Sequence, residues 1–241
     1  MMNLLSRCRA LFPALIAACL LAGCASPPRT AADDQAVHKV AVLSLLDEQT
    51  PVSRVGLTVF NNQRLTIDQS GALNAFADEV LEKRLRAARP NWTVVQATAD
   101  AKALEEKNRG TPWTSFTGRI SDDLHRIAQQ TGADLMFVVI DTTMENSPGR
   151  GVGVSMRTMS LNSVDKTLLH THALLVLVDR DGKELTNRGI AGGDKTVDAK
   201  DLGLSYDLST LQQPEVQKRV SDALRQQLAQ GLEQAAQHMG Y

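Results

Sequence analysis

The chain has 241 residues, of which 43% are hydrophobic and 22% are charged, and its formal net charge is −1. These proportions are typical of a globular protein that buries a core. The near-neutral charge and the aromatic content of 4% exclude the basic, aromatic-rich surface of a nucleic-acid-binding protein, so we expect no nucleic-acid partner.

The first 23 residues have the three parts of a secretory signal peptide. A basic segment with Arg7 and Arg9 precedes an apolar run over residues 10–21, and two small residues follow it. A transmembrane helix needs about 20 apolar residues, so this run is too short for a permanent span. We therefore predict a signal peptide over residues 1–23.

The signal peptide ends in the residues Leu21-Ala22-Gly23-Cys24, which resemble the lipobox of bacterial lipoproteins. In that family the cysteine thiol receives a diacylglyceryl group, the chain is cut before the cysteine, and the new amino group is acylated. The resemblance implies lipid attachment at Cys24 and stable anchorage in a lipid bilayer, because two or more acyl chains hold a protein there. The alternative is an ordinary cleaved signal peptide.

The residue after Cys24 bears on the membrane that holds the protein. Members of the family with Asp at that position stay in the inner membrane, whereas this chain has Ala25. The resemblance therefore implies the periplasmic face of the outer membrane, for a Gram-negative source.

The cysteines divide the chain into functional regions. Cys8 and Cys19 lie in the signal peptide, so Cys24 is the only cysteine of the mature protein. This excludes a disulfide, a cysteine-ligated zinc ion and a thiol nucleophile in the mature domain.

Residues 24–37 are small and polar and include two prolines, which predicts a flexible, extended tether. Residues 38–241 are expected to form a single periplasmic domain.

The periodicity of apolar residues predicts an α/β fold. Near-continuous apolar runs at residues 40–46 and 135–140 indicate strands that are buried on both faces. Further strands are expected at residues 55–60, 63–67, 92–97, 152–159, 168–178 and 183–186. Helices are expected at residues 72–88, 99–108, 121–131 and from residue 214 to near the end. We predict a mixed sheet of about five to seven strands with helices packed on it and one long C-terminal helix.

Three connections have recognisable chemistry. Asn61-Asn62 predicts a tight hairpin turn, because asparagine tolerates positive φ, and Asp181-Gly182 predicts a second hairpin turn. Residues 189–213 are rich in Gly and Asp without a firm period, so we expect a long excursion over the surface.

Carboxylates follow both buried strands and form the first candidate site. Asp47 and Glu48 follow residues 40–46, and Asp141 follows residues 135–140. Ligands of parallel α/β sheets bind beyond the carboxyl ends of the strands, where these groups could bind a cation or act as acid and base. The alternative, which we favour, is that strands simply end where polar residues begin.

Two histidines form the second candidate site. His170 and His172 are two residues apart on an expected strand, so they face the same way. Such a pair can hold a metal ion, but the sequence places no third ligand. We favour a pair of exposed histidines, and we assign no catalytic residue, metal ligand or cofactor.

Two other patterns have ordinary explanations. The glycines of residues 149–153 resemble a phosphate-binding loop only superficially, because a strand is expected after them, and a hairpin loop is favoured. A basic cluster at the end of the helix at residues 72–88 opposes the helix dipole, although lipid headgroups or glycan acids could also use it. That cluster consists of Lys83, Arg84, Arg86 and Arg89.

Beyond the lipobox, the pattern of the mature chain resembles envelope accessory lipoproteins, the group of the curli-secretion lipoprotein and the activators of penicillin-binding proteins. The resemblance rests on residues 40–46, 131–135 and 175–185. It implies a non-enzymatic α/β domain that contacts another envelope protein.

We therefore expect a membrane-anchored periplasmic lipoprotein that binds a protein or assists envelope assembly. One alternative is a periplasmic hydrolase or metal-binding protein that uses the carboxylates at the strand ends. The other is a passive structural or stress lipoprotein.

Overall fold

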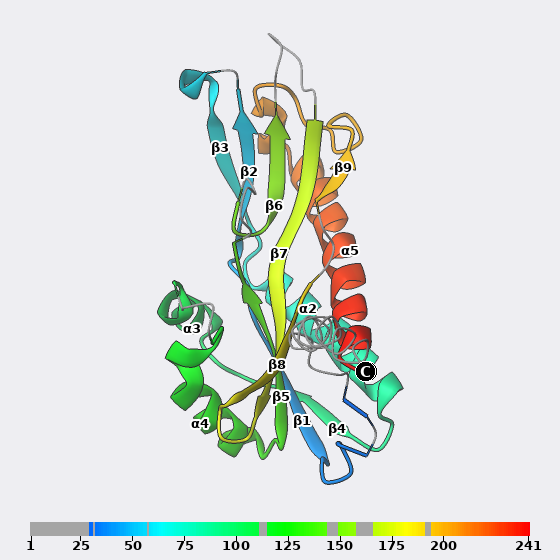
Figure 1. Cartoon of the computed structure of the whole chain (residues 1–241). Helices are drawn as coiled ribbons and strands as arrows, with labels where there is room; N and C mark the ends of the chain where they lie inside the picture. Colours follow the sequence, from blue (N-terminus) through cyan, green and yellow to red (C-terminus); the bar gives the residue numbers. More distant parts are fainter. Residues whose placement is uncertain are drawn as a thin grey trace, which may run out of the picture.

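The computed structural model describes residues 29–30, 32–56, 58–110, 115–143, 149–157, 166–190 and 194–241 (Figure 1). The predicted signal peptide, the lipobox and Cys24 lie outside the described residues. None of the described helices is long and apolar enough to cross a membrane.

One mixed sheet runs through the whole described structure. Its strands are β1 (Lys39–Leu45), β2 (Gln49–Val55), β3 (Gln63–Asp68), β4 (Thr93–Gln96), β5 (Leu135–Asp141), β6 (Gly151–Arg157), β7 (Lys166–Asp179), β8 (Glu184–Gly189) and β9 (Lys195–Val197). Seven of them follow one another in the order β3-β2-β6-β7-β5-β1-β4, and β8 and β9 also pair with β7. The predicted α/β class with a mixed sheet is confirmed.

The long strand β7 joins two halves of the sheet. Its residues 166–172 pair with β6, and its residues 173–179 pair with β5, both antiparallel. On its other side β9 pairs with the first half and β8 with the second. The partners of β7 therefore change between His172 and Ala173, and the molecule is elongated along β7 (Figure 1).

Helices cover both faces of the half that contains β5 and β1. The described helices are α2 (Ala72–Ala88), α3 (Ala101–Asn108), α4 (Ser121–Thr131) and α5 (Pro214–His238). α2 and α5 pack on one face, where Val40, Val42 and Phe137 are completely buried. α3 and α4 pack on the other, over Ala41 and Val138. Both central strands are thus buried on two faces, as their continuous apolar sequences predicted.

The predicted hairpin at Asn61-Asn62 is wrong in its first strand and in its turn. β2 spans residues 49–55 rather than 55–60, and residues 56–62 connect it to β3 with a short 3-10 helix, η1 (Val59–Asn61). β2 was not predicted because its polar residues interrupt the apolar pattern that indicates a strand. One of them, Arg54, is buried because its guanidinium donates to the carbonyl oxygens of Asn61 and Tyr206.

The expected surface excursion of residues 189–213 is also corrected. It contains β9 and a 3-10 helix, η3 (Ser209–Gln212), and four of its leucines are buried in the core beside α5. These residues are Leu202, Leu204, Leu208 and Leu211. Leucines spaced irregularly along a turn-rich segment give no period, so the pattern could not reveal this packing.

The predicted tether over residues 24–37 is wrong for its described part. Residues 32–36 form turns, and the Asp34 side chain is buried between Arg29 and Arg89. The backbone N–H of Arg29 also donates to the carbonyl of Met239 at 3.1 Å. Ion pairing therefore holds this polar segment against the domain, although its composition is typical of an unpacked linker.

Candidate functional site

A cleft of about 610 Å³ lies at the carboxyl end of β1. Its walls come from the loop after β1, the first turns of α2, and α3. β1 is parallel to β4 and β5, so this edge is where a ligand of an α/β sheet is expected. Among the described residues, the cleft is lined by two cations, Lys102 and Arg109, and by six acids: Asp47, Glu48, Asp68, Asp78, Glu105 and Glu106.

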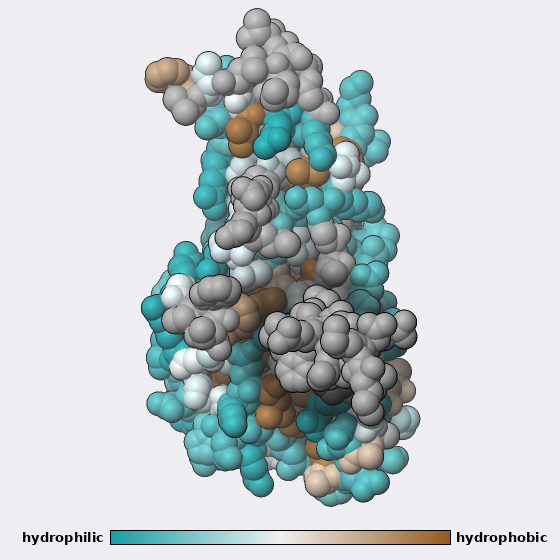
Figure 2. Space-filling model, in the orientation of Figure 1, coloured by the Kyte–Doolittle hydropathy of each residue, from teal (hydrophilic) through white to brown (hydrophobic). Residues whose placement is uncertain are grey.

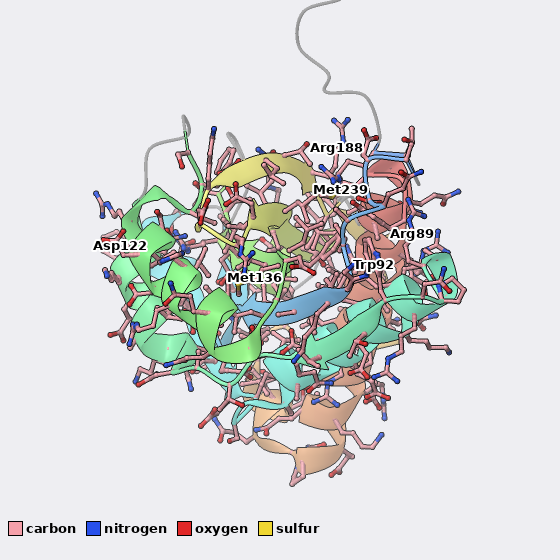
Figure 3. The ribbon with its side chains drawn as sticks, turned by 90° about the horizontal axis from the view of Figure 1, so that it is seen from below. Arg89, Trp92, Asp122, Met136, Arg188 and Met239 are labelled. Carbon is pink, nitrogen blue, oxygen red and sulfur yellow. The ribbon has the colours of Figure 1, made fainter. Side chains whose placement is uncertain are left out.

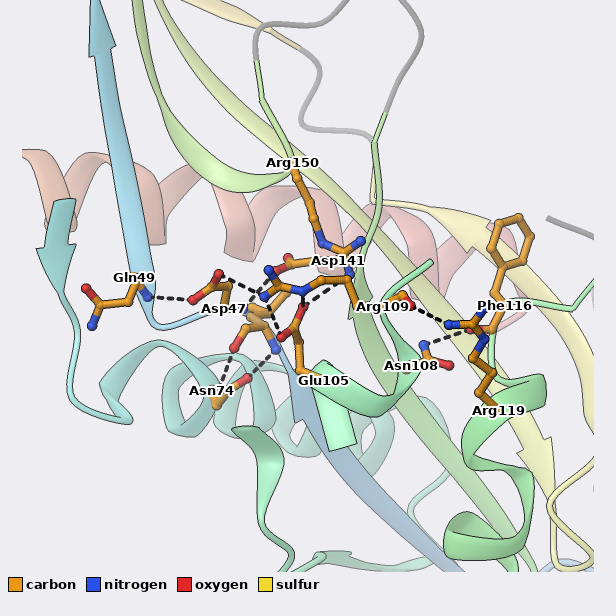
Figure 4. Close-up of polar contacts among 11 residues, drawn as sticks. Asp47, Gln49, Asn74, Glu105, Asn108, Arg109, Phe116, Arg119, Asp141 and Arg150 are labelled. Atoms are coloured by element: carbon orange, nitrogen blue, oxygen red, sulfur yellow. Dashed lines mark hydrogen bonds and ion pairs between the residues drawn. The ribbon is translucent and has the colours of Figure 1, made fainter. Parts of the chain in front are cut away.

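Asp47 and Asp141, which the sequence singled out, are brought together at this edge (Figure 4). The backbone N–H of Asp47 donates to Oδ2 of Asp141 at 2.7 Å. Asp141 is only 6% exposed, and its Oδ1 has no hydrogen-bond partner among the described residues. Burial raises the pKa of the Asp141 carboxyl to about 7, against the opposing effects of the Asp47 hydrogen bond and the Arg150 charge.

Two arginines converge on Glu105 beside this carboxylate pair. Arg109 donates to both carboxylate oxygens of Glu105, at 3.2 and 2.8 Å, and Arg150 contacts Oε1 at 3.2 Å. Arg109 also reaches Asp47 at 3.4 Å. The hydrogen bonds with Glu105 raise the pKa of the Arg109 guanidinium. The buried negative charge of Glu105 is thus compensated by two cations from different parts of the chain.

Glu48 does not contact Asp141; its carboxylate instead accepts hydrogen bonds at the start of α2. Its carboxylate accepts hydrogen bonds from the backbone N–H groups of Leu73 and Asn74, at 3.3 and 2.9 Å. The Asn74 amide donates to Glu48 at 2.7 Å and to the carbonyl of Leu46 at 3.0 Å. α2 begins after Gly71, which has no side chain to cap the helix, so Glu48 supplies that acceptor.

A second buried carboxyl, Asp78, lines the inner wall of the cleft. It accepts a hydrogen bond from the Ser44 hydroxyl at 2.7 Å. Burial raises the pKa of Asp78 to about 6, and the hydrogen bond from Ser44 acts in the opposite direction. Two carboxyl groups with raised pKa values therefore lie at this edge of the sheet, Asp78 in the cleft wall and Asp141 behind the loop after β1.

The carboxylates that line the cleft are complementary to a cationic group. In the described part of the chain, no three His, Cys, Asp or Glu side chains are placed to hold a metal ion. The serine in the cleft wall, Ser44, is bonded to a carboxyl and not to a histidine, so it lacks the base of a hydrolytic triad. What the cleft offers is an excess of carboxylates around apolar walls.

The two histidines lie elsewhere, and the expectation that they are exposed is wrong. His170 and His172 are 1% and 2% exposed, and their rings stack with centroids 4.9 Å apart, on the same side of β7 as predicted. The ring of His172 contacts the Gly149 carbonyl at 2.9 Å and Asp194 at 3.2 Å. The edge of the His170 ring leaves no room for a Cβ at Gly149, which precedes β6, or at Gly153 within β6, so these two glycines enclose it.

Burial also sets the protonation state of His170. Neither of its ring nitrogens has a hydrogen-bond partner among the described residues. Burial, with a smaller contribution from the neighbouring His172, lowers the pKa of His170 to about 4. The ring is therefore neutral at pH 7.

Four residues of the cleft network were not identified from the sequence: Asp78, Glu105, Arg109 and Arg150. Asp78 could have been found, because it is a carboxylate within the apolar stripe of the helix at residues 72–88. Arg150 was noticed only as part of a glycine-rich loop, and the strand predicted after that loop is confirmed as β6. Glu105 and Arg109 lie one helical turn apart on a surface-like helix, so their sequence gave no sign of a shared role.

Comparison with known proteins does not extend this description. No protein-family model matches the chain, and no curated protein matches it.

Proposed function

We propose that this protein is an outer-membrane lipoprotein whose periplasmic domain binds a partner protein through the acidic cleft. The anchor rests on the resemblance of Leu21-Ala22-Gly23-Cys24 to a lipobox. One observation supports the binding role: the cleft has six carboxylate residues and two cations. A volume of about 610 Å³ admits a few side chains, so the occupant is a lysine- or arginine-bearing segment of the partner.

The anchor is tested by Cys24→Ala. This variant should leave the membrane fraction, because only the thioether-linked and amide-linked acyl chains hold the mature protein there. A protein that remains in the lipid fraction without Cys24 would show that the lipobox is not its anchor.

The binding role is tested by a photo-crosslinking residue placed in living cells. Ala75 lines the cleft and is exposed, whereas Ala87 is exposed on the same helix outside the cleft. We expect a crosslinked species from position 75 that is absent from position 87. Glu106→Lys should weaken it severalfold, and the same charge change at Glu79, outside the cleft, should not.

A second candidate function, a hydrolase or metal-binding protein, is favoured by one feature, the buried Asp141 with its pKa near neutrality. Against it, Asp141 is not among the residues that line the cleft. If Mg²⁺, Ca²⁺ or Zn²⁺ raised the melting temperature of the protein but not of Asp47→Asn, the metal-binding role would replace our proposal. Crosslinks that did not depend on position would favour a passive structural role.

A further inference from the structure

The N-terminal segment is fixed to the end of α5. The backbone N–H of Arg29 donates to the carbonyl of Met239, and its guanidinium contacts Asp34 at 2.9 Å. A Cβ on Gly240 would lie 2.1 Å from the carbonyl oxygen of Arg29, so the two backbones touch. The described chain therefore emerges toward Cys24 beside the C-terminus.

Two arginines at the C-terminal end of α2, Arg84 within the helix and Arg89 just after it, reinforce this attachment. Arg89 donates to Asp34 at 3.1 Å and to the Gly240 carbonyl at 3.1 Å, and Asp34 is only 4% exposed. Arg84 donates twice to the C-terminal oxygen of Tyr241, at 3.1 and 2.6 Å. Figure 3 shows Arg89, Trp92 and Met239 together on this side of the molecule. Two arginines of the basic cluster thus hold Asp34 of the N-terminal segment and the C-terminal residues Gly240 and Tyr241.

Only four residues, 25–28, separate Cys24 from Arg29. An extended chain spans at most about 3.6 Å per residue, so the α-carbon of Cys24 lies within about 18 Å of Arg29. The acyl chains on Cys24 begin at the membrane surface. The end of α5 must therefore stay close to the lipid headgroups.

The remaining cations of the basic cluster face outward at the same end of the domain. Lys83 and Arg86 are exposed on the last two turns of α2, and α2 packs along α5. Arg86 is paired with Glu82 at 2.6 Å, and the exposed Asp33 accepts hydrogen bonds from Thr30. Phosphate groups of anionic lipids are complementary to these two cations.

The opposite end of the domain is far from this attachment. α5 has 25 residues and is about 37 Å long, and it begins beside η3, near the β2–β3 connection at the top of Figure 1. Phe60 of that connection is 92% exposed, and a hydrophobic group protrudes there in Figure 2.

We propose that the face formed by the C-terminal ends of α2 and α5 lies on the headgroups of the bilayer that anchors the protein. Lys83 and Arg86 then contact anionic lipid phosphates, and the β2–β3 end with Phe60 points away from the membrane. This orientation rests on the proposed lipid anchor at Cys24, and it adds the surface that the domain presents to the lipid.

The orientation can be measured with single-cysteine labels, because the mature chain has no other free thiol. The acylated protein carrying Ala87→Cys is labelled with a fluorophore and reconstituted in phosphatidylethanolamine–phosphatidylglycerol vesicles that contain a headgroup nitroxide quencher. Thr58→Cys, at the β2–β3 end, is the matched control. We expect at least twofold stronger quenching at position 87 than at position 58.

Equal quenching at the two positions, or stronger quenching at position 58, would overturn the orientation while the protein still floats with the vesicles. A protein that does not float with them would overturn the anchor and the orientation together. Lys83→Glu combined with Arg86→Glu should reduce quenching at position 87, whereas Lys195→Glu on β9 should not. The lipid-phosphate contact would be disproved if the label at position 87 were quenched equally in the double variant and in the parent. Equal quenching in vesicles of phosphatidylcholine alone would disprove it as well.

Discussion

The backbone N–H of Asp47 and the carboxylate of Asp141 are joined by a 2.7 Å hydrogen bond at the point where the sheet divides. β5 ends at Asp141, and from the next residue pair onward β7 is paired with β6 instead. The loop that follows β1 begins at the same level. A buried carboxyl group at the end of β5 therefore bonds to the loop after β1 and faces Gly151 of β6, at the point where β7 changes partners.

The first prediction concerns the pH dependence of stability. The Asp141 pKa is about 7 in the folded protein and 3.8 as its ordinary value, so the folded state binds more protons between these pH values. Stability from this group therefore decreases as the pH rises from 4 to 7, by about 3 kcal/mol between pH 5 and pH 8. Asp141→Asn should remove this dependence, and it should be more stable relative to the parent at pH 8 than at pH 5.

The measurement is the free energy of unfolding of both proteins in urea across this pH range. Asp78→Asn is the matched control, because the Asp78 pKa is about 6 and its effect should level off one pH unit lower. A constant difference between Asp141→Asn and the parent at all pH values would show that Asp141 ionises as freely in the folded protein as in the unfolded chain.

The second prediction concerns the glycine that faces this carboxyl. Gly151 has a φ of +68°, and a Cβ there would lie 2.7 Å from the Asp141 carboxyl group. Gly151→Ala should therefore destabilise the protein by about 2 kcal/mol or more, through backbone strain and displacement of Asp141. Gly189→Ala provides the control, since no atom lies within 4 Å of the added methyl group. Comparable melting temperatures for the two variants would contradict the close approach.

Much of the fold follows from local patterns in the sequence. The strand at residues 135–140, the helix at residues 72–88 and the C-terminal helix from Pro214 are confirmed because long apolar periods determine them. β2 was misplaced because Gln49, Pro51 and Arg54 interrupt its apolar pattern, and the burial of Arg54 depends on a partner elsewhere in the chain. Such partners are brought close only by the tertiary fold, so a short segment of the sequence cannot predict them.

The candidate site could be predicted only in part, because some of its residues depend on partners that are distant in the sequence. Asp47 and Asp141 were named as a possible site because parallel strands end at one edge, although an ordinary strand end was the favoured interpretation. Glu48, beside Asp47 in the sequence, points instead to the start of α2, and adjacent positions cannot reveal this difference. The burial of His170 and His172 depends on the register of β7 against the glycines of β6, which the sequence does not specify.

The third prediction concerns His170. Its pKa is about 4 in the folded protein, below the ordinary value of 6.5, so the unfolded chain binds more protons between these pH values. Stability from this residue is present above pH 6.5 and is lost on acidification, by about 2 kcal/mol at pH 5. His170→Leu should lose less stability than the parent between pH 7.5 and pH 5.

Urea unfolding at these two pH values measures the effect of His170. The same substitution at His238, which is exposed near the end of α5, controls for the loss of a histidine. An equal loss of stability in the parent and in His170→Leu would mean that the buried ring accepts its proton without cost.

The fourth prediction separates the structural role of Glu48 from binding in the cleft. Glu48→Ala leaves the N–H groups of Leu73 and Asn74 without their acceptor, so it should destabilise the protein by about 1 kcal/mol, the usual effect of removing a helix cap. Glu106→Ala removes a carboxylate from the same cleft, but Glu106 is exposed and caps no helix, so its melting temperature should match that of the parent. Glu48→Gln should recover part of the lost stability, because the amide oxygen can still accept from Asn74. If Glu48→Ala unfolded like the parent while it weakened the crosslink from position 75, Glu48 would belong to the binding surface instead of the helix cap.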